Sequence, residues 1–232
     1  MSSFNLAVLI SGSGSNQQAV MDAVADGRIP NAKVAVVISS REGVYGLERA
    51  ENRDIPNMVI DRHDIATLLE TLETYDINGI VLAGYLTVLP QDVVDKYDKK
   101  IINIHPALLP MFGGKGFYGI RVHKAVLASG VPYTGATAHI VDRGVDTGAA
   151  LIRGVVRVLE DDTAESLQKR VLEVEHRILV QAVKALAESR VEELMKKPMV
   201  LVDDKDKKGV FEFAQGLIEL GKVLTAEDEK SI

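Results

Sequence analysis

The sequence predicts a doubly wound α/β fold, with a mostly parallel sheet, an antiparallel pair of strands at one edge and a long helix near the C-terminus. Short apolar runs alternate with segments of helical periodicity from the first residues, and this alternation favours parallel strands joined by crossover helices. The rhythm changes after residue 130, where strands follow one another before the long helix. The chain has 232 residues, of which 47% are hydrophobic, so it can bury one large core.

Apolar runs in the first half have the length of strands, and the segments between them have the polar face of helices. The expected strands are Leu6–Ile10, Val34–Ile38, Asn57–Ile60, Ile80–Ala83 and Lys100–Ile104. The expected helices are Asn16–Ala25, Val44–Asn52, Ile65–Tyr75 and Gln91–Tyr97. Crossover helices between successive strands make a parallel arrangement the expected one.

The second half contains two further apolar runs, Thr137–Val141 and Leu151–Val158, joined by the polar loop Asp142–Gly148. A direct connection of this kind favours an antiparallel pair, which we expect on one edge of the sheet.

A long helix follows, with Asp162 or Thr163 as its cap and an end near Arg190. One apolar stripe runs along it and is expected to pack on the sheet. The stripe consists of Leu167, Val171, Val174, Ile178, Ala182 and Ala185.

The chain is expected to divide into a domain at residues 1–198 and a C-terminal extension of unknown role at residues 199–232. Within the extension, Met199–Val202 has the composition of a short edge strand, and Val210–Leu220 has that of a helix.

Composition excludes several classes of function. The net charge of −6 at pH 7 argues against a nucleic-acid partner, which normally requires a basic surface. The absence of cysteine excludes disulfides and thiolate metal sites, and the five histidines lack the spacing of a zinc site. No apolar run is long enough for a membrane span, and the first residues lack the basic region of a signal peptide. We therefore expect a cytoplasmic monomer or homodimer without metal, whose partners are small molecules.

The end of the expected strand at residues 100–104 is the most informative site in the sequence. Asn103 and His105 share one face of an extended chain, while Ile102 and Ile104 point to the opposite layer. Pro106 has no N–H group for a ladder and disfavours helix before it, so the strand is expected to end there. Ligands of open α/β sheets bind at the carboxyl ends of strands, which makes this pair a candidate site.

The loop Ser11–Asn16 joins the first strand to the first helix and has the sequence Ser-Gly-Ser-Gly-Ser-Asn. Its backbone N–H groups and the helix N-terminus favour an anion, most simply a monophosphate. A dinucleotide is disfavoured because Gln17 replaces the third glycine of the usual fingerprint and Ser39 to Arg41 provide no acidic residue. The alternative is a tight turn that needs glycine only for its backbone.

The loop Asp142–Gly148 is expected to return a carboxylate to His105. Such a neighbour would raise the pKa of the histidine and favour imidazolium, while Asn103 would donate to a developing oxyanion. This combination suits addition to a carbonyl group without a covalent intermediate. The alternative is that Asp142 and Asp146 only form a turn. Of the other histidines, His139 is expected to line a pocket or the core, and His123 is expected at the surface.

Four motifs occur in the order found in the phosphoribosylglycinamide formyltransferases, and the chain resembles this family over residues 4 to 190. They are Ile10–Asn16, Val81–Tyr85, Asn103–Pro110 and Val145–Gly148. The second and third are shared with other folate-dependent formyltransferases, so the first discriminates. The resemblance implies a Rossmann-like formyltransferase fold whose N-terminal half binds the ribonucleotide phosphate and whose C-terminal half binds the folate. It also implies 10-formyltetrahydrofolate as co-substrate and glycinamide ribonucleotide as formyl acceptor.

The resemblance implies three groups of site residues. The catalytic residues are Asn103, His105 and Asp146. The ribonucleotide is expected at Ser13, Gly14, Ser15, Asn16, Glu173 and Glu175. The folate is expected at Arg62, Leu86, Thr87, Val88, Leu89, Asn103, Asp142, Arg143, Gly144, Val145 and Asp146.

Two segments depart from the pattern of the family. Leu86-Thr87 stands where many relatives have methionine and arginine, which alters the expected folate contacts. The loop at residues 111–119 is long and rich in glycine, and it is expected to form a mobile lid with Lys115 near an anion.

Other functions remain compatible with the sequence. A formyltetrahydrofolate deformylase would use water in place of the amine. A nonenzymatic nucleotide-binding module would use only the loop Ser11–Asn16. A dinucleotide dehydrogenase is disfavoured by the incomplete glycine fingerprint.

Overall fold

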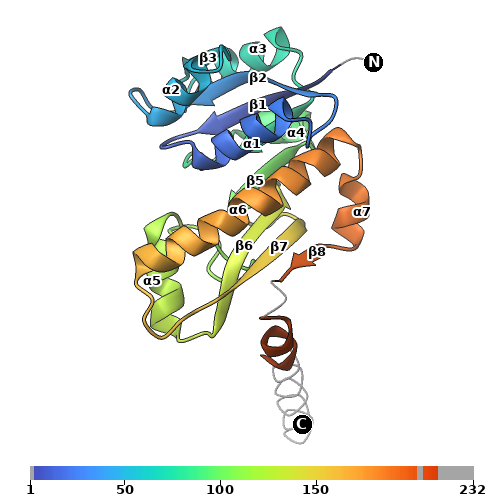
Figure 1. Ribbon diagram of the computed structural model, residues 1–232. Coiled ribbons are helices and arrows are strands. Elements are labelled where there is room, and N and C mark those ends of the chain that lie inside the picture. The colour runs from blue at the N-terminus through green and yellow to red at the C-terminus, as the bar shows by residue number, and fades with distance from the viewer. Residues whose placement is uncertain (1–2, 203–205, 214–232) are drawn as a thin grey trace, which may run out of the picture.

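The computed structural model describes residues 3–202 and 206–213, and within these it contains a sheet of eight strands covered by helices on both faces (Figure 1). The strands are β1 (Phe4–Ile10), β2 (Ala32–Ser39), β3 (Asn57–Val59), β4 (Gly79–Leu82), β5 (Ile101–His105), β6 (Tyr133–Ile140), β7 (Ala150–Arg157) and β8 (Met199–Leu201). The helices are α1 (Ser15–Ala25), α2 (Tyr45–Glu51), α3 (Ile65–Thr74), α4 (Gln91–Lys96), α5 (Ile120–Ser129), α6 (Ala164–Ala187) and α7 (Val191–Lys196).

The strand order is β3-β2-β1-β4-β5-β6-β7-β8, and the first five strands are parallel. β6 runs antiparallel to both β5 and β7, and β8 then pairs parallel with β7. The predicted doubly wound fold is therefore confirmed, with β8 at the edge outside the antiparallel strands. Because β8 begins at Met199, the sheet continues past the domain boundary expected at residue 198.

The two faces of the sheet bury separate hydrophobic clusters. Along β1, Leu6 and Val8 pack under α1 and α6, whereas Ala7 and Leu9 pack under α3 and α4. This alternation follows from the two-residue period of an extended chain. A parallel strand buried on both faces is apolar throughout, which explains the unbroken hydrophobic run from Leu6 to Ile10 in β1.

The long helix α6 crosses one face of the sheet (Figure 1). Thr163 is its cap and exchanges side-chain and backbone hydrogen bonds with Ser166. It ends at Ala187 instead of the expected Arg190, because Ser189 adopts a left-handed backbone with φ of 58° and the N–H group of Arg190 bonds back to Ala185. A short separate helix, α7, then leads to β8. α7 was not among the expected elements, and α5 was expected only as a helix that starts near His123.

The helix expected at Val210–Leu220 lies partly outside the described residues. Residues 207–213 are helical, and the ring of Phe213 lies 5.6 Å from that of Tyr133 on β6.

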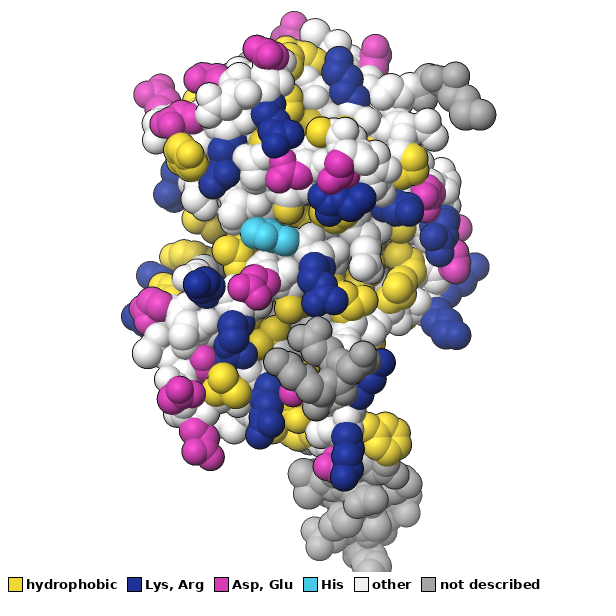
Figure 2. All heavy atoms as spheres, viewed as in Figure 1, with side chains coloured by type: hydrophobic (Ala, Val, Ile, Leu, Met, Phe, Trp, Pro, Cys, Tyr) yellow, Lys and Arg dark blue, Asp and Glu magenta, His cyan; other side chains and the backbone are white. Residues whose placement is uncertain are grey.

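No helix in the described part of the chain is long and apolar enough to cross a membrane. On the face in Figure 2, the acidic and basic side chains drawn in colour are interspersed over the surface. This distribution differs from the single-sign patch that nucleic-acid binding favours.

Close packing of β6 against β7 generates a stability prediction. A Cβ atom added to Gly135 would run into the backbone carbonyl of Gly154. We expect Gly135→Ala to lower the free energy of unfolding by at least about 1 to 3 kcal/mol, because the backbone of β6 or β7 must move to admit the methyl group. Urea denaturation followed by circular dichroism measures this change. Wild-type stability would contradict the packing of these two strands.

Candidate functional site

A cleft of about 730 Å³ opens at the carboxyl ends of the parallel strands. The strand order reverses between β1, which leads to β2 and β3, and β4, which leads to β5. This reversal separates the loops that follow β1 and β4 and creates a crevice, as in other doubly wound sheets. The hydroxyl of Ser11 links the segments that follow β1, β2 and β4. It accepts from the N–H group of Leu86 at 2.9 Å and lies 2.7 Å from the hydroxyl of Ser40.

One end of the cleft is formed by the glycine loop between β1 and α1. Ser13, Ser15 and Asn16 line the cavity, whereas Gly14 lies behind them with a left-handed φ of 72°. A Cβ atom on Gly14 would lie 2.8 Å from Cα of Gly46 at the start of α2. Glycine is therefore required twice at this position, for its backbone conformation and for the close approach of α2. The free N–H groups at the start of α1 make this end suited to an anion.

Residues that the sequence analysis did not assign hold this loop in shape. The side chain of Gln17 donates to the carbonyl of Gly46 at 2.9 Å, and the N–H group of Gly46 donates to Gly12 at 3.1 Å. Arg49 donates to the carbonyl of Ser13 at 2.9 Å and stacks over the ring of Tyr45. The residue that breaks the dinucleotide fingerprint, Gln17, thus fastens the loop to α2.

A buried carboxylate faces the same end of the cleft from α6. Asn16 donates to Glu175 at 2.6 Å, and burial raises the pKa of Glu175 although this hydrogen bond opposes the shift. The side-chain oxygen of Asn16 is buried without a hydrogen-bond partner. Buried polar atoms are normally paired, so this oxygen is available to a donor on a ligand.

Asn103 and His105 lie at the end of β5 as predicted. Ile102 and Ile104 belong to the opposite layer, under α6. Asn103 is directly opposite His139 on β6, and its Nδ2 atom lies 3.0 Å from Nε2 of that ring. His139 is buried and lines the cleft, as expected.

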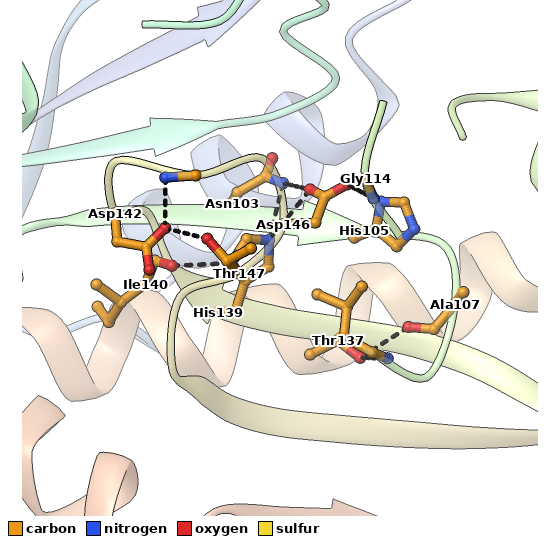
Figure 3. Close-up of polar contacts among 12 residues, drawn as sticks. Asn103, His105, Ala107, Gly114, Thr137, His139, Ile140, Asp142, Asp146 and Thr147 are labelled. Carbon is orange, nitrogen blue, oxygen red and sulfur yellow. Dashed lines mark hydrogen bonds and ion pairs between the residues drawn. The ribbon is translucent and has the colours of Figure 1, made fainter. Parts of the chain in front are cut away.

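Asp146 joins this pair by a fold-back of the loop after β6 (Figure 3). The loop leaves Ile140, which pairs with Ile102 near the start of β5, and must turn over the sheet to reach His105. Oδ2 of Asp146 lies 3.5 Å from Nδ1 of His105, and Oδ1 lies 3.5 Å from Nδ2 of Asn103. Asp146 has a left-handed φ of 58°, a conformation that aspartate tolerates better than most residues.

The protonation of the pair differs from the expectation. Burial lowers the pKa of His105, and this effect outweighs the Asp146 carboxylate and the Phe112 carbonyl, which both raise it. The predicted net increase in the pKa of His105 is therefore wrong, and the imidazole of His105 is neutral at pH 7. Burial alone would raise the pKa of Asp146. His139, His105 and the N–H group of Gly114 lower it by more, so the net pKa is lowered and the carboxyl is ionised.

Comparisons with known proteins agree with this geometry. The Formyl transferase family model matches residues 4–183. The chain belongs to the formyl transferase family.

Its relatives include proteins named for formyl transfer to phosphoribosylglycinamide and for purine biosynthesis. The chain is 42% identical over 194 residues to "Phosphoribosylglycinamide formyltransferase, chloroplastic" of Arabidopsis thaliana, covering 80% of this chain and 66% of that protein. It is 40% identical over 179 residues to "Trifunctional purine biosynthetic protein adenosine-3" of Drosophila melanogaster, covering 74% of this chain but only 13% of that protein. The solved structure of glycinamide ribonucleotide transformylase 1 from Symbiobacterium toebii superposes with a TM-score of 0.76 at 39% identity, over 81% of this chain and 89% of that one.

Most of the other residues expected from the family resemblance lie along the same cleft. Those that line it are Leu86, Thr87, Val88, Leu89, Asp142, Arg143, Gly144 and Val145. Asp142 also braces its own loop, accepting from Thr147 at 2.6 Å and from Gly144 at 3.0 Å, and Arg143 pairs with Asp95 on α4. Two residues are elsewhere: Arg62 is exposed beside His63, and Glu173 is exposed on α6, neither lining the cavity.

His123 corrects another expectation. It lies at the start of α5 but is buried and lines the cleft, not the surface. Its Nδ1 atom has no partner, and burial together with His105 lowers its pKa to about 4. His123 shares the buried face of α5 with Val122 and Val126, so its burial follows from the packing of this helix.

The electrostatics of the trio can be measured directly. We expect the pKa of His105 to lie below 6.5, and to fall further in Asp146→Asn, because the substitution removes the charge that stabilises imidazolium. Ring-proton NMR titration of the labelled histidine measures both values. Asp95→Asn, which removes a surface carboxylate paired with Arg143, should leave the His105 titration unchanged. A higher pKa in Asp146→Asn would contradict the contact between the two side chains.

Proposed function

We propose that this protein transfers the formyl group of 10-formyltetrahydrofolate to the amine of N1-(5-phospho-D-ribosyl)glycinamide. The products are formylglycinamide ribonucleotide and tetrahydrofolate, a step of de novo purine (IMP) biosynthesis. One observation carries the proposal: a single cleft joins the anion loop at Ser13–Asn16 to the trio Asn103, His105 and Asp146. The name of the plant relative supports this activity, and the name of the insect relative supports a role in purine biosynthesis.

The ribonucleotide fits the end of the cleft between α1 and α6. The 5′-phosphate would be held by the N–H groups and hydroxyls of the glycine loop, where the helix dipole favours negative charge. A ribose hydroxyl would donate to the unpaired oxygen of Asn16 and contact Glu175. The amine would then extend toward the trio in the middle of the cleft.

The formylfolate fits the other end of the cleft. Leu86, Val88 and Val145 are apolar and exposed there, so burying them under an aromatic ring is favourable. The backbone and side chains of residues 142–144 offer polar groups along the same wall. Thr87 carries no charge, so in this chain the segment Leu86–Leu89 would hold the folate by shape and backbone contacts.

The trio can support direct transfer with balanced protons. The amine nitrogen attacks the formyl carbon, and the carbonyl electrons move to the oxygen. Asn103 donates to that oxyanion, because one N–H of its amide faces His139 and the second is held only by a long contact with Asp146. Neutral His105 accepts the amine proton, and Asp146 stabilises the resulting imidazolium. Return of the proton to N10 accompanies cleavage of the bond between the formyl carbon and N10.

The rival activities make different predictions. A deformylase needs water at the place of the amine, and the anion loop, Asn16 and Glu175 would then have no substrate to bind. A nonenzymatic nucleotide module would not need Asn103, His105 and Asp146 to converge. The preferred activity uses both halves of the cleft.

An assay of amine dependence tests the proposal. We expect 10-formyltetrahydrofolate or its dideaza analogue to be deformylated only when glycinamide ribonucleotide is present, as followed by absorbance. Asp146→Asn should lower kcat by ~10²-fold or more, because the imidazolium formed during transfer loses the carboxylate that stabilises it. Asp26→Asn, at the exposed end of α1, controls for the change in charge. Formyl release without the amine would favour the deformylase.

The ribonucleotide end can be tested separately. Asn16→Asp places a second carboxylate beside Glu175 and in the anion site, so it should raise KM for glycinamide ribonucleotide by ~10-fold or more. KM for the formylfolate should change little. Asn52→Asp at the exposed end of α2 is the matched control. Equal increases in both KM values would contradict this division of the cleft.

Cytoplasmic location and a monomeric or homodimeric state stay predictions. Fractionation of cells and sedimentation of the purified protein test them.

A further inference from the structure

We propose that the glycine loop at residues 111–119 is a positioning element for catalysis, whose backbone orients both His105 and Asp146. The proposal rests on the proposed function, because it assigns how the acid-base pair of that reaction is held. The sequence suggested a lid for this loop, but its contacts give it a more specific role.

The first contact fixes the ring of His105. Nε2 of His105 lies 2.8 Å from the carbonyl oxygen of Phe112. A carbonyl accepts only, so Nε2 carries the hydrogen and the neutral ring presents its lone pair at Nδ1. Nδ1 is the atom that faces Asp146. The loop therefore leaves Nδ1 as the nitrogen that can gain a proton. A proton at Nδ1 faces the Asp146 carboxylate, which stabilises it.

The second contact fixes the carboxylate itself. The N–H group of Gly114 donates to Oδ2 of Asp146 at 3.0 Å. Asp146 is otherwise faced by His105 and Asn103 from β5 and by His139 from β6. Gly114 thus donates to Oδ2, the same oxygen of Asp146 that faces the ring of His105. A donor to the ionised form keeps a buried carboxyl charged, which the stabilisation of imidazolium requires.

The loop can make both contacts only with its particular backbone. Phe112 and Gly114 have positive φ angles of 52° and 89°, so the carbonyl of one and the N–H group of the other turn inward. Between them, a Cβ atom on Gly113 would press on Leu109 and approach Cβ of Asp146 to 3.4 Å. Thr137 and Arg153 anchor the start of the loop through the backbone of Leu109. Glycine is therefore favoured at Gly113 by the nearby Leu109 side chain and at Gly114 by its positive φ.

Two matched glycine substitutions test the proposal. Gly114 and Gly116 have similar φ angles of 89° and 97°, and a Cβ atom at either meets nothing within 4 Å. Alanine strains the backbone at both positions, but only Gly114 bonds to Asp146. We expect Gly114→Ala to raise the pKa of the Asp146 carboxyl, measured by carbon-13 NMR, and to shift the acid limb of the kcat profile upward. Gly116→Ala should leave the Asp146 titration unchanged.

The value of kcat should fall when the Asp146 carboxyl loses its bond to Gly114. Gly114→Ala should lower kcat at neutral pH by ~10-fold, the effect of one charge-assisted hydrogen bond, with a smaller change in either KM. The proposal is overturned if the two variants titrate alike, or if Asp146 titrates as in the wild type in Gly114→Ala while the protein stays folded by circular dichroism. The NMR titration needs no substrate, so it decides the role of the loop even if the wild-type protein fails to transfer formyl groups.

Discussion

The structure depends on one buried carboxylate and the partners that allow it to stay ionised. The side chain of Asp146 is only 11% exposed, and a buried charge is tolerated only when it is paired and hydrogen-bonded. Its partners come from three places in the chain: Asn103 and His105 on β5, His139 on β6, and Gly114 in the glycine loop. The antiparallel return of β6 beside β5 is what brings these places together, so the topology of the sheet and the chemistry of the site are linked.

In the proposed transfer, the same carboxylate allows a histidine that is neutral at rest to carry a positive charge during the reaction. Burial keeps His105 neutral before reaction, which leaves Nδ1 able to accept a proton. Once that proton arrives, Asp146 faces a positive ring at short range in a partly dry cleft, where the attraction is stronger than in water. Binding of substrates that exclude water would strengthen it further. In the proposed transfer, the charged histidine is therefore a state produced during turnover and not the resting state.

At the other end of the cleft, the shape of the glycine loop is fixed by contacts within the protein. Gly14, Gln17 and Gly46 interlock α1 with α2, and Arg49 holds the carbonyl of Ser13. Loop ordering is an entropic cost that a ligand would otherwise bear on binding, so a preformed anion loop favours affinity. Each end of the cleft is therefore set by contacts between loops that follow different strands.

The sequence by itself determined the order of the strands and of most helices, the end of β5 at Pro106 and the shared face of Asn103 and His105, because these follow from local periodicity and from proline. It also marked the anion loop and, through family motifs, Asp146. Only the tertiary structure decided the neutral state of His105, the burial of His123, the exposure of Arg62 and Glu173, and the contacts of Gln17, Arg49 and Gly114. Those properties depend on burial and on backbone contacts between segments far apart in the chain, and no local pattern of side chains encodes them.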